Sequence, residues 1–319
     1  MKKMLSLILA LTMVMALCVF APAASADETY TVGICQFVQH DALDAATQGF
    51  IDALTEELGD AVTFDNQNAS ADFSTCGIIC TNFVASNVDL ILANATPALQ
   101  AAAQATDTIP ILGTSVTEYG VALEIENFDG VVGGNVSGTS DLAPLDQQAA
   151  MITELFPEAK KVGILYCSSE ANSVYQADVV QKALEDNGIE VTIAKFDDSN
   201  NVALVTQELC SAVDVIYIPT DNTAASCAEA ISNVAEPAGI PIIAGEENLC
   251  KGCGVATLSI NYYDLGVTTG KMAAKILKGE ADISEMPIEY FPDPVKKYNP
   301  EFADAFQINF PDDYVAIEG

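Results

Sequence analysis

The sequence predicts an α/β protein made of two doubly wound lobes, each a parallel β-sheet covered by helices. Strand-like and helix-like runs alternate with short connections, which is typical of parallel sheets covered by helices, and the same order of elements occurs twice along the chain. In addition, 319 residues, of which 50% are hydrophobic, are enough chain for two packed domains.

The elements of the first half follow from the spacing of its apolar residues. Apolar positions at helical spacing from Leu43 to Leu58, followed by Gly59, predict the first helix. Pro97 suits the first turn of a later helix, where no backbone N–H is needed. We expect strands at 31–38, 62–68, 89–93 and 109–113, and helices at 42–58, 73–86 and 97–106.

Four glycines between 127 and 140 interrupt this order and mark a domain boundary. The second half has the same pattern, with Gly188 as the end of one helix. We expect helices at 145–156, 173–187, 202–211 and 223–238, strands at 161–166, 190–196, 214–219 and 241–244, and a further strand at 255–262 and helix at 265–277. Because ligands of open α/β sheets bind at the carboxyl ends of the strands, the cleft between the lobes is the expected site.

The charge of the chain excludes two classes of partner. All 12 basic residues are lysines, and against 45 acidic residues they give a net charge of -33. Nucleic acids and anionic lipids are bound by clustered positive charge, which this sequence lacks. The acidity itself bears on solubility rather than on fold.

The first 26 residues are typical of a signal peptide. Lys2 and Lys3 precede an apolar run at 4–20, and small residues before position 27 form an expected cleavage site. A spanning helix is the alternative, and Cys18 leaves a lipid anchor open. We therefore expect an exported protein, at the cell surface, outside the cell or in a periplasm.

Eight cysteines follow the predicted signal peptide: Cys35, Cys76, Cys80, Cys167, Cys210, Cys227, Cys250 and Cys253. Their even number permits disulfides outside the cell, but the pairing cannot be deduced from the sequence. Cys76 and Cys80 lie one turn apart on a predicted helix, and Cys250 and Cys253 lie in a predicted loop. A zinc site built from these two pairs is an alternative. Small buried hydrophobic residues are the preferred interpretation, ahead of disulfides and of a metal.

No catalytic signature is present. The first strand is not followed by a glycine-rich dinucleotide turn, there is no Gly-x-Ser-x-Gly motif, and the only histidine is His40. We therefore expect a binding protein without cofactor or metal, rather than an enzyme. Turnover by a nucleophile built on His40 is the third class of function to test.

Small polar residues follow several predicted strands, among them Thr96, Ser115, Asn172, Ser173 and Asp221. Each could simply cap a helix, because such side chains satisfy the free N–H groups of the first turn. Without arginine, a ligand carboxylate would be held by helix N-termini and hydroxyls, and Thr96, Asn172 and Ser173 suit that role. Asp221 could receive an ammonium group, or be a plain N-cap.

Five segments resemble one family. They are 38–44 (VQHDALD), 94–98 (NATPA), Tyr166 with 170–173 (EANS), 219–222 (PTDN) and 260–266 (INYYDLG). Together they are similar to the ABC-transporter substrate-binding proteins that include tryptophan- and tyrosine-binding members, over nearly all of the chain beyond residue 26. The resemblance implies a periplasmic-binding fold of type I, in which three hinge segments, near 137–141, 259–262 and 287–292, join lobes that close on the ligand.

The implied domains are a signal peptide at 1–26, lobe one at 27–139 plus 261–288, and lobe two at 140–260 plus 289–319. By resemblance to the family's amino-acid binders, Asp221 of this chain would bind the α-ammonium group of the ligand. Its carboxylate would be surrounded by Thr96, Asn172 and Ser173. Phe37, Tyr166 and Tyr262 would line the side-chain pocket, with Ser115 and Ser140 also contacting the ligand. The chain departs from the family at 115–119, where an Asp-Pro is usual, and at Asp41, which replaces a proline. Both departures bear on side-chain specificity.

The sequence thus predicts a monomeric, non-enzymatic receptor of an ABC importer. It would capture a small amino acid, aromatic or apolar, between its lobes and deliver it to a membrane permease. A receptor for another solute, such as a sugar or a nucleoside, is the alternative, although the absence of tryptophan removes the best residue for sugar stacking. A ligand sensor that signals without transport is also open.

Overall fold

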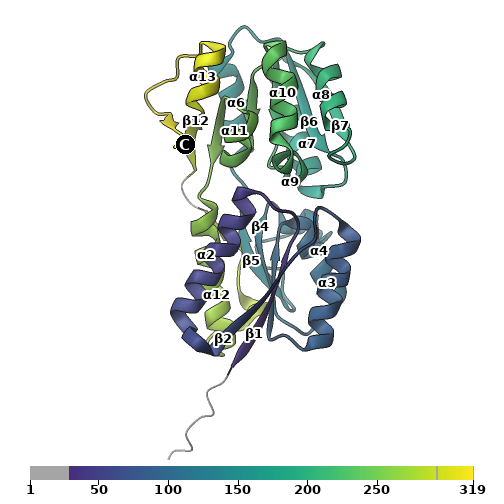
Figure 1. Ribbon diagram of the computed structural model, residues 1–319, viewed down its shortest axis with the longest axis vertical. Helices are drawn as coiled ribbons and strands as arrows, with labels where there is room; N and C mark the ends of the chain where they lie inside the picture. Colours follow the sequence, from purple (N-terminus) through teal and green to yellow (C-terminus); the bar gives the residue numbers. More distant parts are fainter. Residues whose placement is uncertain (1–28, 292–293, 319) are drawn as a thin grey trace, which may run out of the picture.

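The structure is a computed structural model that describes residues 29–291 and 294–318. It consists of two α/β lobes, one above the other (Figure 1), which confirms the predicted fold class. The predicted signal peptide and the possible lipid anchor at Cys18 lie outside the described residues. Within the described ranges no helix is both long and apolar enough to cross a membrane.

Lobe one contains a sheet of six parallel strands in the order β11-β5-β4-β3-β1-β2. Helices α2 and α12 cover one face, and α3 and α4 cover the other (Figure 1). The strands are β1 (Tyr30–Gln36), β2 (Val62–Asn68), β3 (Leu90–Asn94), β4 (Ile111–Val116), β5 (Val136–Ser140) and β11 (Glu289–Tyr290). The helices are α2 (Asp41–Leu58), η1 (Gly59–Ala61), α3 (Phe73–Ser86), α4 (Thr96–Ala105), α5 (Tyr119–Ala122), α12 (Tyr262–Leu277) and η2 (Ile283–Glu285).

Lobe two contains a sheet of seven strands in the order β13-β12-β10-β9-β8-β6-β7, in which only the β10–β12 pair is antiparallel. The strands are β6 (Lys161–Cys167), β7 (Glu190–Phe196), β8 (Val215–Ile218), β9 (Ile242–Ala244), β10 (Ala256–Ser259), β12 (Val295–Tyr298) and β13 (Val315–Ala316). The helices are α6 (Leu145–Leu155), α7 (Ala171–Asp186), α8 (Val202–Cys210), α9 (Asn222–Ser226), α10 (Ala228–Ala238), α11 (Glu247–Cys253) and α13 (Pro300–Phe306).

Three elements differ from the sequence expectation. The strand expected over 255–262 ends at Ser259 as β10, and the following helix α12 begins at Tyr262 rather than at 265. The helix expected over 223–238 is divided at Cys227 into α9 and α10. The segment with Cys250 and Cys253, expected to be a loop, forms α11, because the carboxylate of Glu246 accepts hydrogen bonds from the backbone N–H groups of Asn248 and Leu249 and so caps a short helix.

The chain crosses between the sheets three times, after β5, after β10 and after β11. Ser140 is the last residue of β5, and Glu289 and Tyr290 pair with Thr139 and Ser140 in the first sheet. The sheets therefore extend lobe one to residue 140 and to residue 290, one and two residues beyond the boundaries expected at 139 and 288.

Helices α2 and α12 pack unusually closely. A Cβ atom at Gly266 would lie 2.0 Å from the backbone oxygen of Ala46, and one at Gly49 would lie 2.1 Å from that of Tyr263. Only glycine leaves room for the opposing backbone at these positions. The contact ties the helix that follows the second crossing to the first helix of lobe one.

We expect Gly266→Ala to destabilise the protein by roughly 1–3 kcal/mol, because the added methyl group must push the two helices apart. Gly77→Ala is the matched control, since a Cβ atom there meets nothing within 4 Å and alanine favours a helix by roughly 0.5–1 kcal/mol. Urea unfolding of both variants measures the difference. Equal stability of the two variants would contradict the close packing.

Candidate functional site

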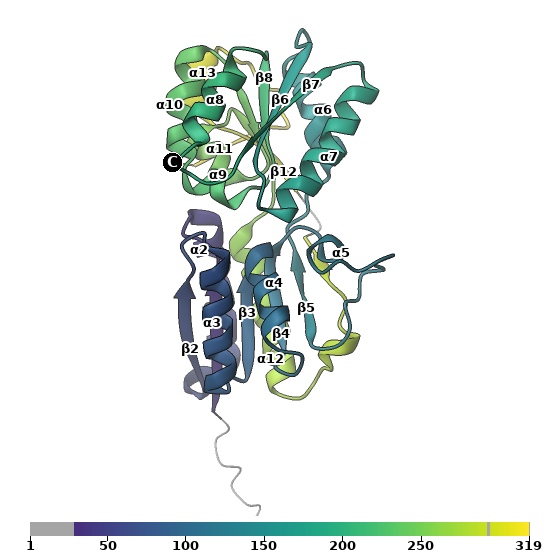
Figure 2. The same ribbon diagram turned by 90° about the vertical axis from the view of Figure 1, so that its right-hand side faces the viewer.

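The carboxyl ends of the strands in the two lobes face each other (Figure 2), and the lobes are in contact there. We call this region the interlobe junction. His40 Nε2, after β1, lies 3.4 Å from Asn222 Oδ1 at the start of α9. Gln176 Nε2, on α7, lies 3.5 Å from Thr117 Oγ1, which follows β4. Helix α7 also contacts α4 and α5, so the structure represents a closed arrangement of the lobes.

Lobe one brings two of the predicted hydroxyls to this edge. Thr96 begins α4 and Ser115 lies near the end of β4, and within the described residues both buried hydroxyl oxygens lack a hydrogen-bond partner. Their backbone is strained, because Ala95 and Ser115 have φ values of 88° and 54° without being glycine. Strain and unpartnered polar atoms at the carboxyl ends of two adjacent strands, β3 and β4, are typical of a binding site.

Lobe two brings Asn172, Ser173 and Asp221 together. Asp221 Oδ1 accepts a hydrogen bond from the N–H of Ala224 at 2.7 Å, and Oδ2 accepts one from the N–H of Cys167 at 2.7 Å. The Ser173 hydroxyl also donates to Asp221. Asp221 is thus an N-cap of α9, as the simpler interpretation expected, and it also joins α9 to β6. Since a carboxylate can accept about four hydrogen bonds and Asp221 accepts from three donors, it can still accept one from an ammonium group.

The atom of Asn172 that lacks a partner is an acceptor. Its Nδ2 donates to the backbone oxygen of Thr220 at 3.0 Å, whereas its buried Oδ1 has no partner among the described residues. This geometry differs from the expected role of Asn172 beside a carboxylate, which would require a free donor.

Glu170 is a buried residue of the junction to which the sequence interpretation gave no role. It is fully buried, and Oε1 accepts hydrogen bonds from the backbone N–H and the hydroxyl of Thr223, at 2.8 and 2.7 Å. Oε2 accepts the side chain of Asn222 at 2.6 Å. The sequence signal that could have identified Glu170 is that it is the one acidic residue in the polar segment 168–173 (SSEANS), which follows a predicted strand. Glu170 holds the start of α9 in place.

Burial raises the pKa of three carboxyl groups in this region. Desolvation, with the charge of Glu170 as a second cause, raises the pKa of Asp221 to about 8. Desolvation also raises the pKa of Glu246 to about 7 and that of Asp141 to about 6. Among the described residues, every charged side chain that is buried is a carboxylate, namely Asp141, Glu170, Asp221 or Glu246.

Tyr262 begins α12, at the end of the hinge segment expected at 259–262. Its hydroxyl donates to Asp141 Oδ2 at 2.9 Å, which joins the second crossing to the first. It packs with Ile260 and Phe291, so the third crossing belongs to the same cluster. Ser140 is also part of the hinge structure, because its hydroxyl donates to the oxygen of Thr117 and accepts the N–H of Leu142.

The other two predicted pocket aromatics lie in the lobe cores. Phe37 is 1% exposed and meets the ring of Phe73 edge-on at 5.5 Å. Tyr166 packs in the core of lobe two, with Lys195 Nζ 5.4 Å from its ring centroid. Neither of these ring contacts involves the unpartnered hydroxyls of lobe one. The aromatic-pocket assignment therefore stays a prediction.

His40 makes no catalytic pair among the described residues. Its Nε2 faces Asn222, and burial lowers its pKa. The described residues contain no group of three or more His, Cys, Asp or Glu side chains that could hold a metal ion. A groove of about 640 Å³ between α3 and α4 lies on the flank of lobe one and contains none of the predicted site residues.

Comparison with known proteins places this geometry in a family. The family described as ABC transporter substrate binding protein matches residues 31–317. A tyrosine-binding protein from Clostridioides difficile (strain R20291) is 38% identical over 263 residues, which are 81% of this chain and 75% of that protein.

Two solved structures show the fold in different states. An ABC domain from Streptococcus pneumoniae in complex with L-Trp is 33% identical, with a TM-score of 0.85 over 89% of this chain and 96% of that one. The ligand-free, open structure of a Clostridium difficile substrate-binding protein with adhesive properties is 36% identical, but its TM-score is only 0.68 over 91% of this chain and 100% of that one. The better fit to the ligand-bound structure agrees with the closed lobes of this protein.

These proteins have the periplasmic-binding fold of type I that the sequence predicts. The family and the relatives are binding proteins rather than enzymes, and the family acts outside the cytoplasm. The resemblance found in the sequence is therefore confirmed: the chain belongs to the ABC transporter substrate-binding proteins.

Proposed function

We propose that the protein is the exported receptor of an ABC importer, which binds an aromatic amino acid at the interlobe junction and delivers it to a membrane permease. The observation that carries this proposal is the charge of the junction. Its buried charged groups are carboxylates, and all lysines of the described residues are outside the buried core. Burying a charged carboxylate costs folding free energy unless a positive charge lies beside it. We therefore expect the ligand to have a positively charged group.

The two lobes offer the two halves of an amino acid different partners. Asp221 and the free Oδ1 of Asn172 are acceptors in lobe two, and we assign them to the α-ammonium. The hydroxyls of Thr96 and Ser115 are donors in lobe one, and we assign them to the α-carboxylate. Ser173 supports Asp221. A zwitterion would then bridge the lobes and stabilise their closed arrangement.

The names of the relatives support an aromatic side chain. One similar protein is described as tyrosine-binding, and one solved structure contains L-Trp. The chain departs from the family at two places near the junction. Asp41 follows His40 directly, and the segment 115–119 begins with Ser115. We therefore expect the choice among aromatic amino acids to differ from that of the relatives.

Calorimetric titration of ligand-depleted protein tests this proposal. We expect L-tyrosine, L-tryptophan or L-phenylalanine to bind, whereas 3-(4-hydroxyphenyl)propionate, which lacks the ammonium group, should bind at least roughly tenfold more weakly. Asp221→Asn should weaken amino-acid binding by about 10- to 100-fold, on the order of 1.4–3 kcal/mol, because it removes a charge-assisted partner.

Asp72→Asn is the matched control. Asp72 is also a helix N-cap, but it is exposed at the start of α3, and asparagine caps helices as well as aspartate does. The control should keep wild-type affinity. Equal affinity of the Asp221→Asn variant would remove Asp221 from the site, and binding of sugars or nucleosides alone would overturn the amino-acid proposal.

The raised pKa values predict an unusual pH dependence of stability. Asp221, Glu246 and Asp141 bind protons more tightly in the folded protein than in the unfolded chain, so unfolding releases protons between about pH 4 and 8. The melting temperature of the ligand-free protein should therefore fall as the pH rises from about 5 to about 8. Asp221→Asn should flatten the upper part of this profile. A melting temperature that rises over this range would contradict the burial of these carboxyl groups.

A further inference from the structure

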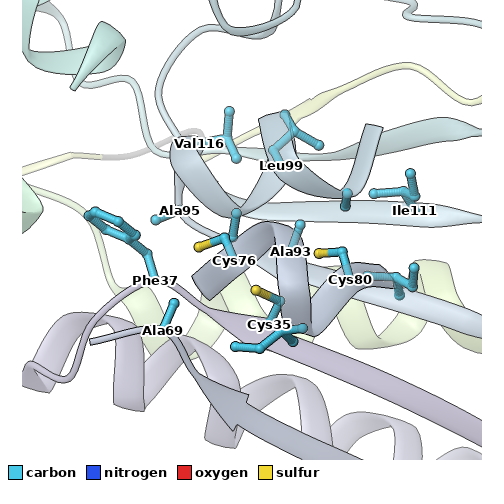
Figure 3. Packing of buried hydrophobic residues seen from close by; sticks show 14 of the residues in the cluster. Cys35, Phe37, Ala69, Cys76, Cys80, Ala93, Ala95, Leu99, Ile111 and Val116 are labelled. Atoms are coloured by element: carbon cyan, nitrogen blue, oxygen red, sulfur yellow. The ribbon is translucent and has the colours of Figure 1, made fainter. Parts of the chain in front are cut away.

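Three buried thiols meet between β1 and α3 of lobe one (Figure 3). Cys35 is in β1, and Cys76 and Cys80 lie one turn apart on the inner face of α3. All three are fully buried, and the Cys35 thiol is within hydrogen-bonding reach of both others. The structure has all three as free cysteines.

The close approach of α3 to the sheet brings these thiols together. A Cβ atom at Gly33 would lie 2.7 Å from the ring of Phe83, so the glycine lets this ring of α3 lie directly on β1. Cys35 points to the same face of the strand as Gly33, two residues earlier. The i and i+4 positions of α3 then both face Cys35, and a single strand thiol has two candidate partners.

We propose that Cys35 forms a disulfide with one of the two α3 thiols, which joins β1 to α3 in the exported protein. This inference rests on the proposed export, because disulfides persist in oxidising compartments outside the cytoplasm. A metal is not the occupant we propose, because the described residues contain no cluster with suitable ligands.

The chemistry requires a disulfide oxidant. The thiolate of Cys80 or Cys76 attacks a sulfur atom of a small-molecule disulfide such as oxidised glutathione, forming a mixed disulfide and releasing one glutathione thiolate. The Cys35 thiolate then attacks the protein sulfur of that mixed disulfide and releases the second glutathione. Two electrons pass from the protein thiols to the oxidant, and the two thiol protons pass to the two glutathione thiolates.

The reaction belongs to the folding of the exported chain. The three sulfur atoms are buried between β1 and α3 in the folded protein. A glutathione molecule can therefore reach them only before α3 packs on the sheet. The finished bond would hold α3 beside β1, where Phe37 and Phe73 already make an edge-on ring contact.

The test is to unfold the full exported chain in reductant, refold it in a mixture of oxidised and reduced glutathione, and block its remaining thiols with an alkylating reagent. Non-reducing peptide mapping by mass spectrometry should then show Cys35 linked to Cys76 or Cys80. The linked protein should melt about 5 °C or more above the same protein refolded in reductant alone. Alkylated Cys35 in the natively refolded protein, or Cys35 linked to a cysteine outside α3, would overturn the proposal.

Two variants separate this bond from other effects of oxidation. Cys35→Ala should lose the difference in melting temperature between the oxidised and reduced protein. Cys210→Ala, which removes a half-buried cysteine of lobe two, should retain that difference. A difference that persists in Cys35→Ala would assign the stabilisation to another pair. Since none of these readouts involves a ligand, they are independent of whether the amino-acid proposal holds.

Discussion

The structure depends on how it accommodates four carboxyl groups that are buried, within the described residues, without a buried lysine. Helix starts provide most of the compensation: Asp221 and Glu170 accept N–H groups of α9, and Glu246 accepts those of α11. These hydrogen bonds fix the carboxylates at the carboxyl edge of the second sheet. They do not fully compensate for the burial of the charged form of Asp221, because burial still raises its pKa. In the proposed function, the ammonium group of the ligand supplies the missing positive charge.

The hinge connects this charge balance to the movement of the lobes. Asp141 in the first crossing accepts the hydroxyl of Tyr262 in the second, and Phe291 in the third packs in the same cluster. Tyr262 also hydrogen-bonds with Thr220 of lobe two, next to Asp221. On the other side, the α2–α12 contact at Gly266 fixes the second crossing to lobe one. In the proposed function, a ligand held by Asp221 would lie close to these crossings, which would bend when the lobes close.

The fold could be predicted from the sequence because each strand and helix has a clear apolar pattern and the pattern repeats. Short helices were harder: α11 begins at Glu246, whose capping role depends on its burial, and the division of 223–238 at Cys227 has no proline or glycine to mark it. For the site, strand-end hydroxyls such as Thr96 were identified by position alone. The burial of Glu170 and the hydrogen bond from Tyr262 to Asp141 depend on contacts between residues far apart in the sequence, which no local pattern reveals.

The most direct test of the central claim is small-angle X-ray scattering of the full exported protein, depleted of ligand and then saturated with the amino acid that binds most tightly. If the ligand's ammonium group balances the buried carboxylates and so lets the lobes close, the radius of gyration should decrease on saturation. The Asp221→Asn variant at the same ligand concentration should show a smaller decrease. An unchanged radius of gyration for the saturated wild-type protein would contradict ligand-driven closure.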